Sequence, residues 1–106
     1  MIITNETIIA VDPIETDYNS IEYVISVNKT WWLVWIRPGD EYQWLNLADN
    51  IDLAEKFDDE QTASEYLERL QNIIDGAAFG FVETELEHEG SKVIVAHSRN
   101  KEETWL

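Results

Sequence analysis

One stretch of this chain, Asp58 to Asp75, repeats its apolar residues with the period of an α-helix, and this segment limits the possible folds more than any other feature. Asp58 is a favourable N-cap, and Gln61 three residues later completes a capping-box pattern. Gly76 is placed to end the helix in the left-handed conformation. The apolar stripe of the expected helix consists of Ala63, Tyr66, Leu67, Leu70 and Ile74.

The rest of the chain is divided into short apolar or alternating runs, which are typical of β-strands. Turn signals separate them at Asn28-Lys29, Pro38-Gly39 and Glu89-Gly90, and Asp12-Pro13 is expected to stop the first strand. We therefore expect an α+β fold, ordered β-β-β-β-α-β-β, with an antiparallel sheet of about five to six strands and one helix packed on one face. The expected strands span residues 7–11, 21–27, 31–36, 42–47, 79–87 and 92–98.

The length of 106 residues suits a single domain spanning residues 1–106, large enough to bury one modest core. The chain has no cysteine, which excludes disulfides and thiolate metal sites. The N-terminal residues do not have the pattern of a signal peptide, and the longest apolar run, Trp31 to Ile36, is too short to cross a membrane. We expect a cytoplasmic protein.

The formal net charge of −15 is the most unusual property of the composition, because 22 acidic residues face only seven Lys and Arg. Five tryptophans argue against a disordered acidic tail. Such a charge repels nucleic acid and anionic membranes and attracts basic protein surfaces. The expected partner is therefore a basic nucleic-acid-binding protein, with no direct contact to nucleic acid or membrane.

Residues that could support catalysis are sparse. His88 and His97 are expected near opposite ends of one hairpin, too far apart to share a metal ion. The acids between Asp49 and Glu55 lack the glycine and the ligand spacing of an EF-hand. Phosphate-binding glycine loops and nucleophile-elbow motifs are absent from the sequence. We therefore expect neither catalysis nor a metal or cofactor.

One candidate binding feature is an acidic row in the second-last expected strand. Alternate side chains of a strand share one face and stand about 6.6 to 6.8 Å apart, on the order of the phosphate spacing along one nucleic-acid strand. The alternative is a solvated outer face, with Val82, Thr84 and Leu86 directed at the core. The row consists of Glu83, Glu85, Glu87 and Glu89.

A second candidate is the set of acids around the helix, for which a plain solvated helix face is again the alternative. Trp31 and Trp35 are expected on the strand face opposite to Trp32, so Trp32 is a candidate exposed anchor for a partner, although core packing would also explain these residues. The helix acids chosen as candidate contacts are Asp58, Asp59, Glu60, Glu65 and Glu68, with Asp49, Asp52 and Glu55 nearby.

The segment from Trp44-Leu45 through Ala54-Glu55-Lys56-Phe57, Thr62-Ala63 and Leu67 to Leu70, followed by a strand, resembles a small module common in phage and mobile-element proteins, and the resemblance covers roughly residues 31–87. In size and charge the chain is also similar to phage-encoded nucleic-acid mimics and anti-CRISPR proteins, and to immunity proteins that neutralise basic nucleases. This resemblance implies an inhibitor, monomeric or homodimeric, that occupies the basic groove of a CRISPR effector nuclease in the host cytoplasm. The alternatives are an immunity protein against a nuclease toxin, a small-ligand-binding accessory domain and a structural subunit.

Overall fold

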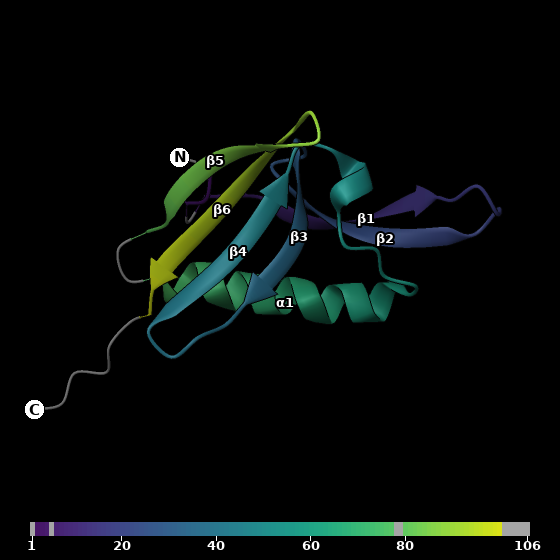
Figure 1. Ribbon diagram of the computed structural model, residues 1–106. Coiled ribbons are helices and arrows are strands. Elements are labelled where there is room, and N and C mark those ends of the chain that lie inside the picture. Colours follow the sequence, from purple (N-terminus) through teal and green to yellow (C-terminus); the bar gives the residue numbers. More distant parts are fainter. Residues whose placement is uncertain (1, 5, 78–79, 101–106) are drawn as a thin grey trace, which may run out of the picture.

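The computed structural model describes residues 2–4, 6–77 and 80–100, and it has the expected α+β architecture. A six-stranded antiparallel sheet has the order β1-β2-β3-β4-β6-β5, and one helix, α1, lies along one of its sides (Figure 1). The elements are β1 (Ile9–Glu15), β2 (Ile21–Val27), β3 (Trp31–Arg37), β4 (Tyr42–Ala48), the 3₁₀ turn η1 (Ile51–Leu53), α1 (Glu60–Gly76), β5 (Val82–His88) and β6 (Ser91–Arg99).

Two hairpin turns lie where the sequence places them. Asn28 and Lys29 have φ values of 54° and 62°, and Glu89 and Gly90 have values of 51° and 82°. Such positive angles at both central residues match the right-handed twist of the joined strands. Gly39, in the turn between β3 and β4, does not have a positive φ; a Cβ at this position would lie 2.6 Å from the carbonyl oxygen of Tyr42.

Strand β1 continues through Asp12-Pro13, so the expectation that this dipeptide ends the strand is wrong. Pro13 pairs with Tyr23, and β1 extends to Glu15. The reason is the position of β1 at the edge of the sheet. An edge strand can hold a proline whose missing N–H would have pointed away from its neighbour.

The helix begins one residue later than its capping pattern indicates. Its N-cap is Asp59, whose carboxylate accepts hydrogen bonds from the backbone N–H of Thr62 at 2.7 Å and from the Thr62 hydroxyl at 2.9 Å. Gly76 is not a left-handed cap, because it is the last residue of α1 and its φ is not positive; the C-cap is Ala77, with φ −67° and its N–H bonded to the Ile74 carbonyl. Ala77 then forms a β-bridge with Asn100, which directs the chain into an extended conformation.

The hydrophobic core lies between α1 and one face of the sheet. The helix contributes Ala63, Leu70 and Ile74, all part of the expected stripe. Phe57 precedes the helix and packs on Tyr66 at 5.2 Å between ring centroids. The sheet contributes Ile25, Val27, Leu33, Leu45, Leu47, Ile94 and Ala96 to this core.

No helix among the described residues combines the length and apolar character needed to cross a membrane.

Candidate binding surfaces

The acidic row of β5 lies on the opposite side of the sheet from the one expected. Glu83 pairs across the sheet with the core residue Ala96, so its side chain shares the face that carries α1. Val82 and Leu86 do not face the core, because their side chains are 59% and 51% exposed on the other side. Since β5 is an edge strand, its alternation determines which residues share a face but not which face the helix covers.

Two members of this row already have partners within the chain. Both carboxylate oxygens of Glu83 accept from the backbone N–H of Ile2 at 2.8 Å, and one also accepts from that of Ile3 at 2.9 Å. Glu85 forms an exposed salt bridge with Lys92 at 3.7 Å. Glu89 belongs to the turn and not to the strand. The row is therefore not a continuous set of free carboxylates.

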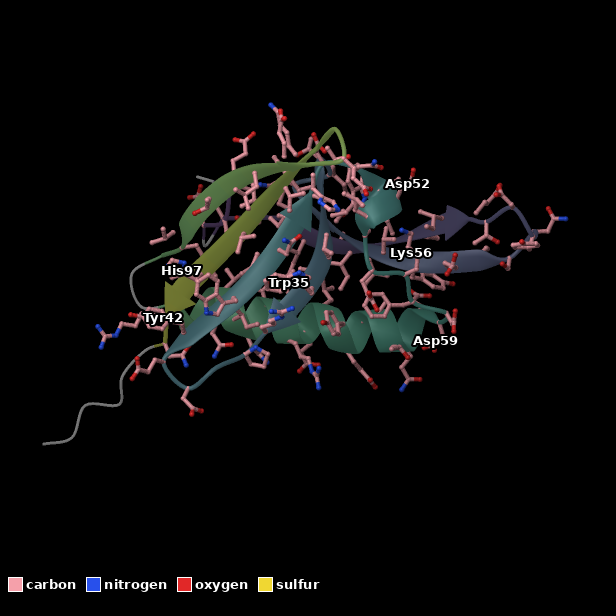
Figure 2. All side chains as sticks on the ribbon, viewed as in Figure 1. Trp35, Tyr42, Asp52, Lys56, Asp59 and His97 are labelled. Carbon is pink, nitrogen blue, oxygen red and sulfur yellow. The ribbon has the colours of Figure 1, made fainter. Side chains whose placement is uncertain are left out.

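The acids around the helix are all exposed to solvent, and we call Asp52, Glu55, Asp58, Glu60, Glu65 and Glu68 the helix acidic surface. Neither salt bridge found among the described residues involves any of them. The ammonium group of nearby Lys56 donates to three backbone carbonyls, at 2.8 to 3.0 Å, rather than to a carboxylate. Figure 2 labels Asp52, Lys56 and Asp59 on the segment that leads from η1 to the start of α1.

Two of the predicted acids near this surface have structural partners. The backbone N–H of Thr62, followed by its hydroxyl, holds the pKa of Asp59 below its usual range, because both hydrogen bonds stabilise the charged carboxylate. The carboxylate of Asp49 accepts from the backbone N–H of Lys92 at 3.0 Å. Asp59 therefore secures the helix N-terminus, and Asp49 ties β4 to β6.

The face of the sheet opposite α1 gathers tryptophans that were expected on different sides. Trp32 pairs with Ala48 and Trp35 with Asn46, two residues apart on β4 and hence on one face. A register shift between Leu33 and Trp35 removes the simple alternation. Trp32 and Trp35 therefore share the outer face, both half-buried, whereas Trp31 packs against the core.

This outer face carries no carboxylate at its outward strand positions. The pairing directs no Asp or Glu of β3, β4, β5 or β6 to this side, although acids make up 22 of the 106 residues of the chain. We call the set the open sheet face: Trp32, Trp35, Arg37, Tyr42, Trp44, Asn46, Ala48, Val82, Thr84, Leu86, His88, Ser91, Val93, Val95, His97 and Arg99.

Aromatic contacts organise one end of the open sheet face. The rings of Trp44 and His97 stack at 4.5 Å between centroids, and Tyr42 meets His97 edge-on at 5.7 Å. The guanidinium of Arg37 lies 4.5 Å from the centre of the Trp35 ring, in a cation–π contact. Figure 2 labels Trp35, Tyr42 and His97 on β3, β4 and β6. The sequence indicated this surface only indirectly, because segments 31–37, 42–48 and 91–99 contain no Asp or Glu.

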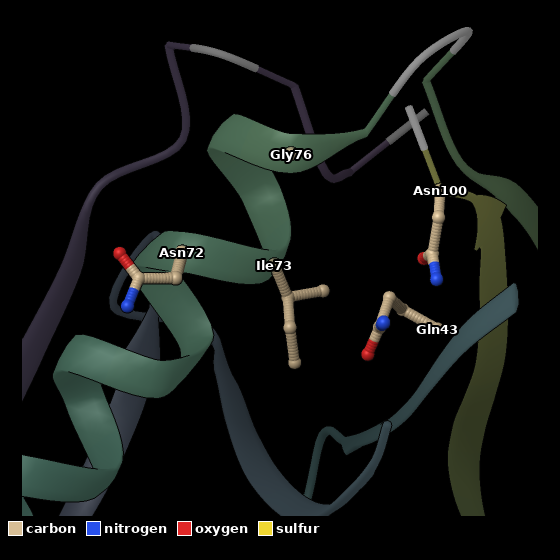
Figure 3. Close-up of a pocket in the computed structure, with 5 residues that line it drawn as sticks. All are labelled: Gln43, Asn72, Ile73, Gly76 and Asn100. Carbon is tan, nitrogen blue, oxygen red and sulfur yellow. The ribbon is translucent and has the colours of Figure 1, made fainter. Parts of the chain in front are cut away.

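Three of the cavities in the described structure adjoin the sheet. One of about 390 Å³ opens on the outer face, with a mainly apolar lining beside the polar Asn46, Glu87 and His88. Another, of about 330 Å³, lies between the last turns of α1 and β4 and is lined by Gln43, Asn72, Ile73, Gly76 and Asn100 (Figure 3). A third, of about 310 Å³, lies between the end of β3 and α1, with Ile36, Tyr66 and Arg69 in its lining. The amides of Gln43 and Asn100 both donate to the Gly39 carbonyl, at 3.2 and 2.9 Å.

Among the described residues, none of these three cavities brings together the groups of a recognisable catalytic centre. His88 pairs with Ser91 beside the turn and His97 with Val82 at the far end of the hairpin, as the sequence indicated. His97 is half-buried in its aromatic stack rather than exposed. Within the part of the chain that the structure describes, no group of three or more His, Cys, Asp or Glu is arranged to hold a metal ion. Comparison of the chain with protein-family models, curated proteins and solved structures finds no match.

Proposed function

We propose that this protein is an inhibitor that binds the basic groove of a nucleic-acid-handling protein through its helix acidic surface. The observation that carries the proposal is that these carboxylates are exposed and take no part in the salt bridges of the described residues, in a chain with net charge −15. A generic soluble domain needs a much smaller net charge to stay in solution. The surplus carries a cost, because like charges repel one another in the folded state.

The arrangement on α1 suits a cationic groove. Glu65 and Glu68 are one helical turn apart, so their side chains are neighbours on the solvent side of the helix. Glu60 and Asp58 continue the surface around the helix N-terminus. A Lys- or Arg-rich groove that normally binds phosphates would relieve the repulsion between these carboxylates. In such a groove the acidic protein would replace the nucleic acid.

The sequence left open whether the acidic strand or the acidic helix is the contact face, and the contacts within the chain favour the helix. Glu83 and Glu85 have partners of their own, and Trp32 lies on the sheet face opposite the helix. The helix acids therefore form the main footprint, with Glu87 and Glu89 as further exposed carboxylates. A CRISPR effector nuclease and a toxin nuclease both offer a suitable groove. A toxin gene directly upstream would favour the immunity protein.

The test combines capture with charge reversal. Immobilised protein is incubated with a nuclease-containing lysate, and we expect a basic nuclease to bind at about 0.1 M salt and to elute near 1 M, where the Debye length falls from about 10 Å to about 3 Å. Duplex DNA should displace it. The double variant Glu65→Lys/Glu68→Lys should lose both capture and inhibition of the eluted nuclease.

A matched control has the same change in net charge at another place. Glu15→Lys/Asp17→Lys alters two exposed acids near the β1–β2 turn and should bind and inhibit nearly as the unmodified protein does. Equal loss in both variants would show that only net charge matters and would contradict the proposed footprint. Capture that is insensitive to salt and DNA would contradict the mimicry itself.

The cavity beside Trp35 supports one alternative of a different class, a small-ligand-binding domain. Its volume of about 390 Å³ lies within the range of ligand pockets, roughly 300 to 1,000 Å³. Asn46 and His88 provide polar groups among apolar ones, as such a pocket requires. Indole serves as a probe: saturable shifts confined to the Trp35 and Asn46 resonances would favour the alternative, and no shifts at millimolar indole would remove it.

A further inference from the structure

The open sheet face carries much of the exposed apolar surface of the described structure. Four of the seven large hydrophobic residues that are exposed in the described structure belong to it: Tyr42 and Trp44 at 39%, Leu86 at 51% and Val82 at 59%. Scattered apolar residues are normal on a protein surface, but a contiguous patch marks an interaction site. The patch lies on the side of the sheet opposite α1, so it is separate from the acids of the helix acidic surface that α1 carries; Asp52 lies in η1, whose Leu53 lines the outer-face cavity.

We infer that the open sheet face is the interface of a homodimer, in which two copies of this chain pack their sheets face to face. The charge pattern favours this occupant. A basic partner would meet Arg37 and Arg99 here and no carboxylate at the outward strand positions. A second copy with net charge −15 is instead repelled by every acidic surface, and this face, where Glu87 lines only the cavity at one end, is where it can approach most closely.

The contents of the face suit contact between sheets. Aromatic side chains provide large, rigid contact area, and Trp, Tyr and Arg are the residues most often dominant at interfaces. Four strands at about 4.8 Å spacing, each about seven residues long, span a plane on the order of 400 Å² before side-chain relief is counted. Counted over both copies this is about 800 Å², below the roughly 1,200 to 2,000 Å² of stable specific interfaces, so the dimer should be weak, reversible and concentration-dependent. The contact is centred on the exposed residues, because Asn46, Ala48 and Val93 are already buried in the monomer.

Face-to-face pairing has a consequence for the proposed function. Since α1 is on the other side of the sheet, both helix acidic surfaces remain exposed, directed away from each other. The dimer would then hold two basic partners, with a stoichiometry of 2:2. The inference does not depend on the identity of that partner.

Self-association is measured by sedimentation equilibrium of the full chain over about 1 µM to about 1 mM, the range of reversible protein association. We expect a monomer–dimer equilibrium that shifts toward dimer as salt rises from about 0.1 to about 1 M, because screening weakens the repulsion between two acidic chains. This salt response is opposite in sign to that of the complex with a basic partner. A monomer at every concentration and salt level would overturn the inference.

A matched pair of variants locates the interface. Leu86→Glu places a carboxylate on the open sheet face, and Ile21→Glu places one on β2, outside it; the original side chains are 51% and 52% exposed. We expect Leu86→Glu to weaken the dimer by about tenfold or more, and Ile21→Glu to leave it nearly unchanged. Circular dichroism and thermal unfolding verify that both variants fold.

The outcomes separate this inference from the proposed function. If both variants dimerise as the unmodified chain does, the open sheet face is not the interface. If single-stranded oligonucleotides bind this face and leave the chain monomeric, the occupant is nucleic acid and the inference is wrong. Glu65→Lys/Glu68→Lys should affect capture of the basic nuclease and still dimerise, whereas Leu86→Glu should capture it with a stoichiometry of 1:1.

Discussion

At the scale of single residues, neighbouring acids of this chain have very different surroundings. Asp58 and Asp59 are adjacent and both exposed, yet only the carboxylate of Asp59 caps the helix, through the backbone N–H and hydroxyl of Thr62. Two residues apart on β5, Glu83 binds backbone N–H groups and Glu85 binds only a lysine at the surface. The number of acids therefore overstates how many are free to meet a partner.

Replacing the N-cap should weaken the fold in a pH-dependent way. Because hydrogen bonds from Thr62 lower the pKa of Asp59 in the folded state, the contribution of this carboxylate is fully present above its unfolded pKa, about 3.9, and is lost as the pH falls through the lower folded value. Asp59→Ala should thus reduce the urea midpoint at about pH 7, and this loss should shrink as the pH falls through the lowered pKa of Asp59. Asp58→Ala is the control, and an equal loss from it would contradict the cap assignment.

At the scale of elements, the edge strand β5 is fastened to the start of the chain. Glu83 holds Ile2 and Ile3, about eighty positions away in sequence, and Ile3 is 2% exposed within the core. This contact explains why a glutamate is found on the helix-bearing face of the sheet. It also assigns a structural role to a residue that the sequence alone suggested as a phosphate mimic.

Removing this carboxylate should release the N-terminal segment. Hydrogen bonds to a charged group contribute about 1.5 to 3 kcal/mol, so Glu83→Ala should lower the free energy of unfolding by about 2 kcal/mol. Hydrogen exchange at the Ile2 and Ile3 amides should accelerate more than exchange in β4. Glu85→Ala removes only an exposed salt bridge and should cost less than about 1 kcal/mol. Unchanged exchange in Glu83→Ala would show that the segment is held by packing alone.

At the scale of the whole molecule, one sheet separates two surfaces of opposite character. The core and the helix, with its acids, lie on one side, and an aromatic face with no carboxylate at its outward strand positions lies on the other. The stability of the monomer should therefore depend on the core between α1 and the sheet. Self-association should depend on the open sheet face.

The same substitution on the two sides tests this division. Leu70 is 1% exposed in the core, and Leu86 is 51% exposed on the open sheet face. Leu70→Ala should cost about 2 to 5 kcal/mol of unfolding free energy, because it leaves a cavity. Leu86→Ala should change the stability of the dilute protein by less than about 1 kcal/mol and weaken the dimer. Urea unfolding at low protein concentration measures both, and similar losses would mean that Leu86 is packed in the monomer.

Local patterns determined much of the fold. The Asn28-Lys29 and Glu89-Gly90 turns, the bounds of β2 and the stripe of α1 could all be read directly, because turn angles and side-chain periodicity depend on residues close in sequence. The charge and the absence of cysteine are likewise properties of the sequence itself. The acids near α1 were identified correctly as exposed.

Only the tertiary structure decided which side of each strand is covered. The alternation in β5 separates Glu83 from Leu86, but the packing of α1 put the glutamate on the helix side. The register shift in β3 brought Trp32 and Trp35 to one face, and the edge position of β1 let that strand continue through Pro13. An alternating strand can direct either of its two faces at the core. Contacts between residues far apart in the sequence decide which face is buried.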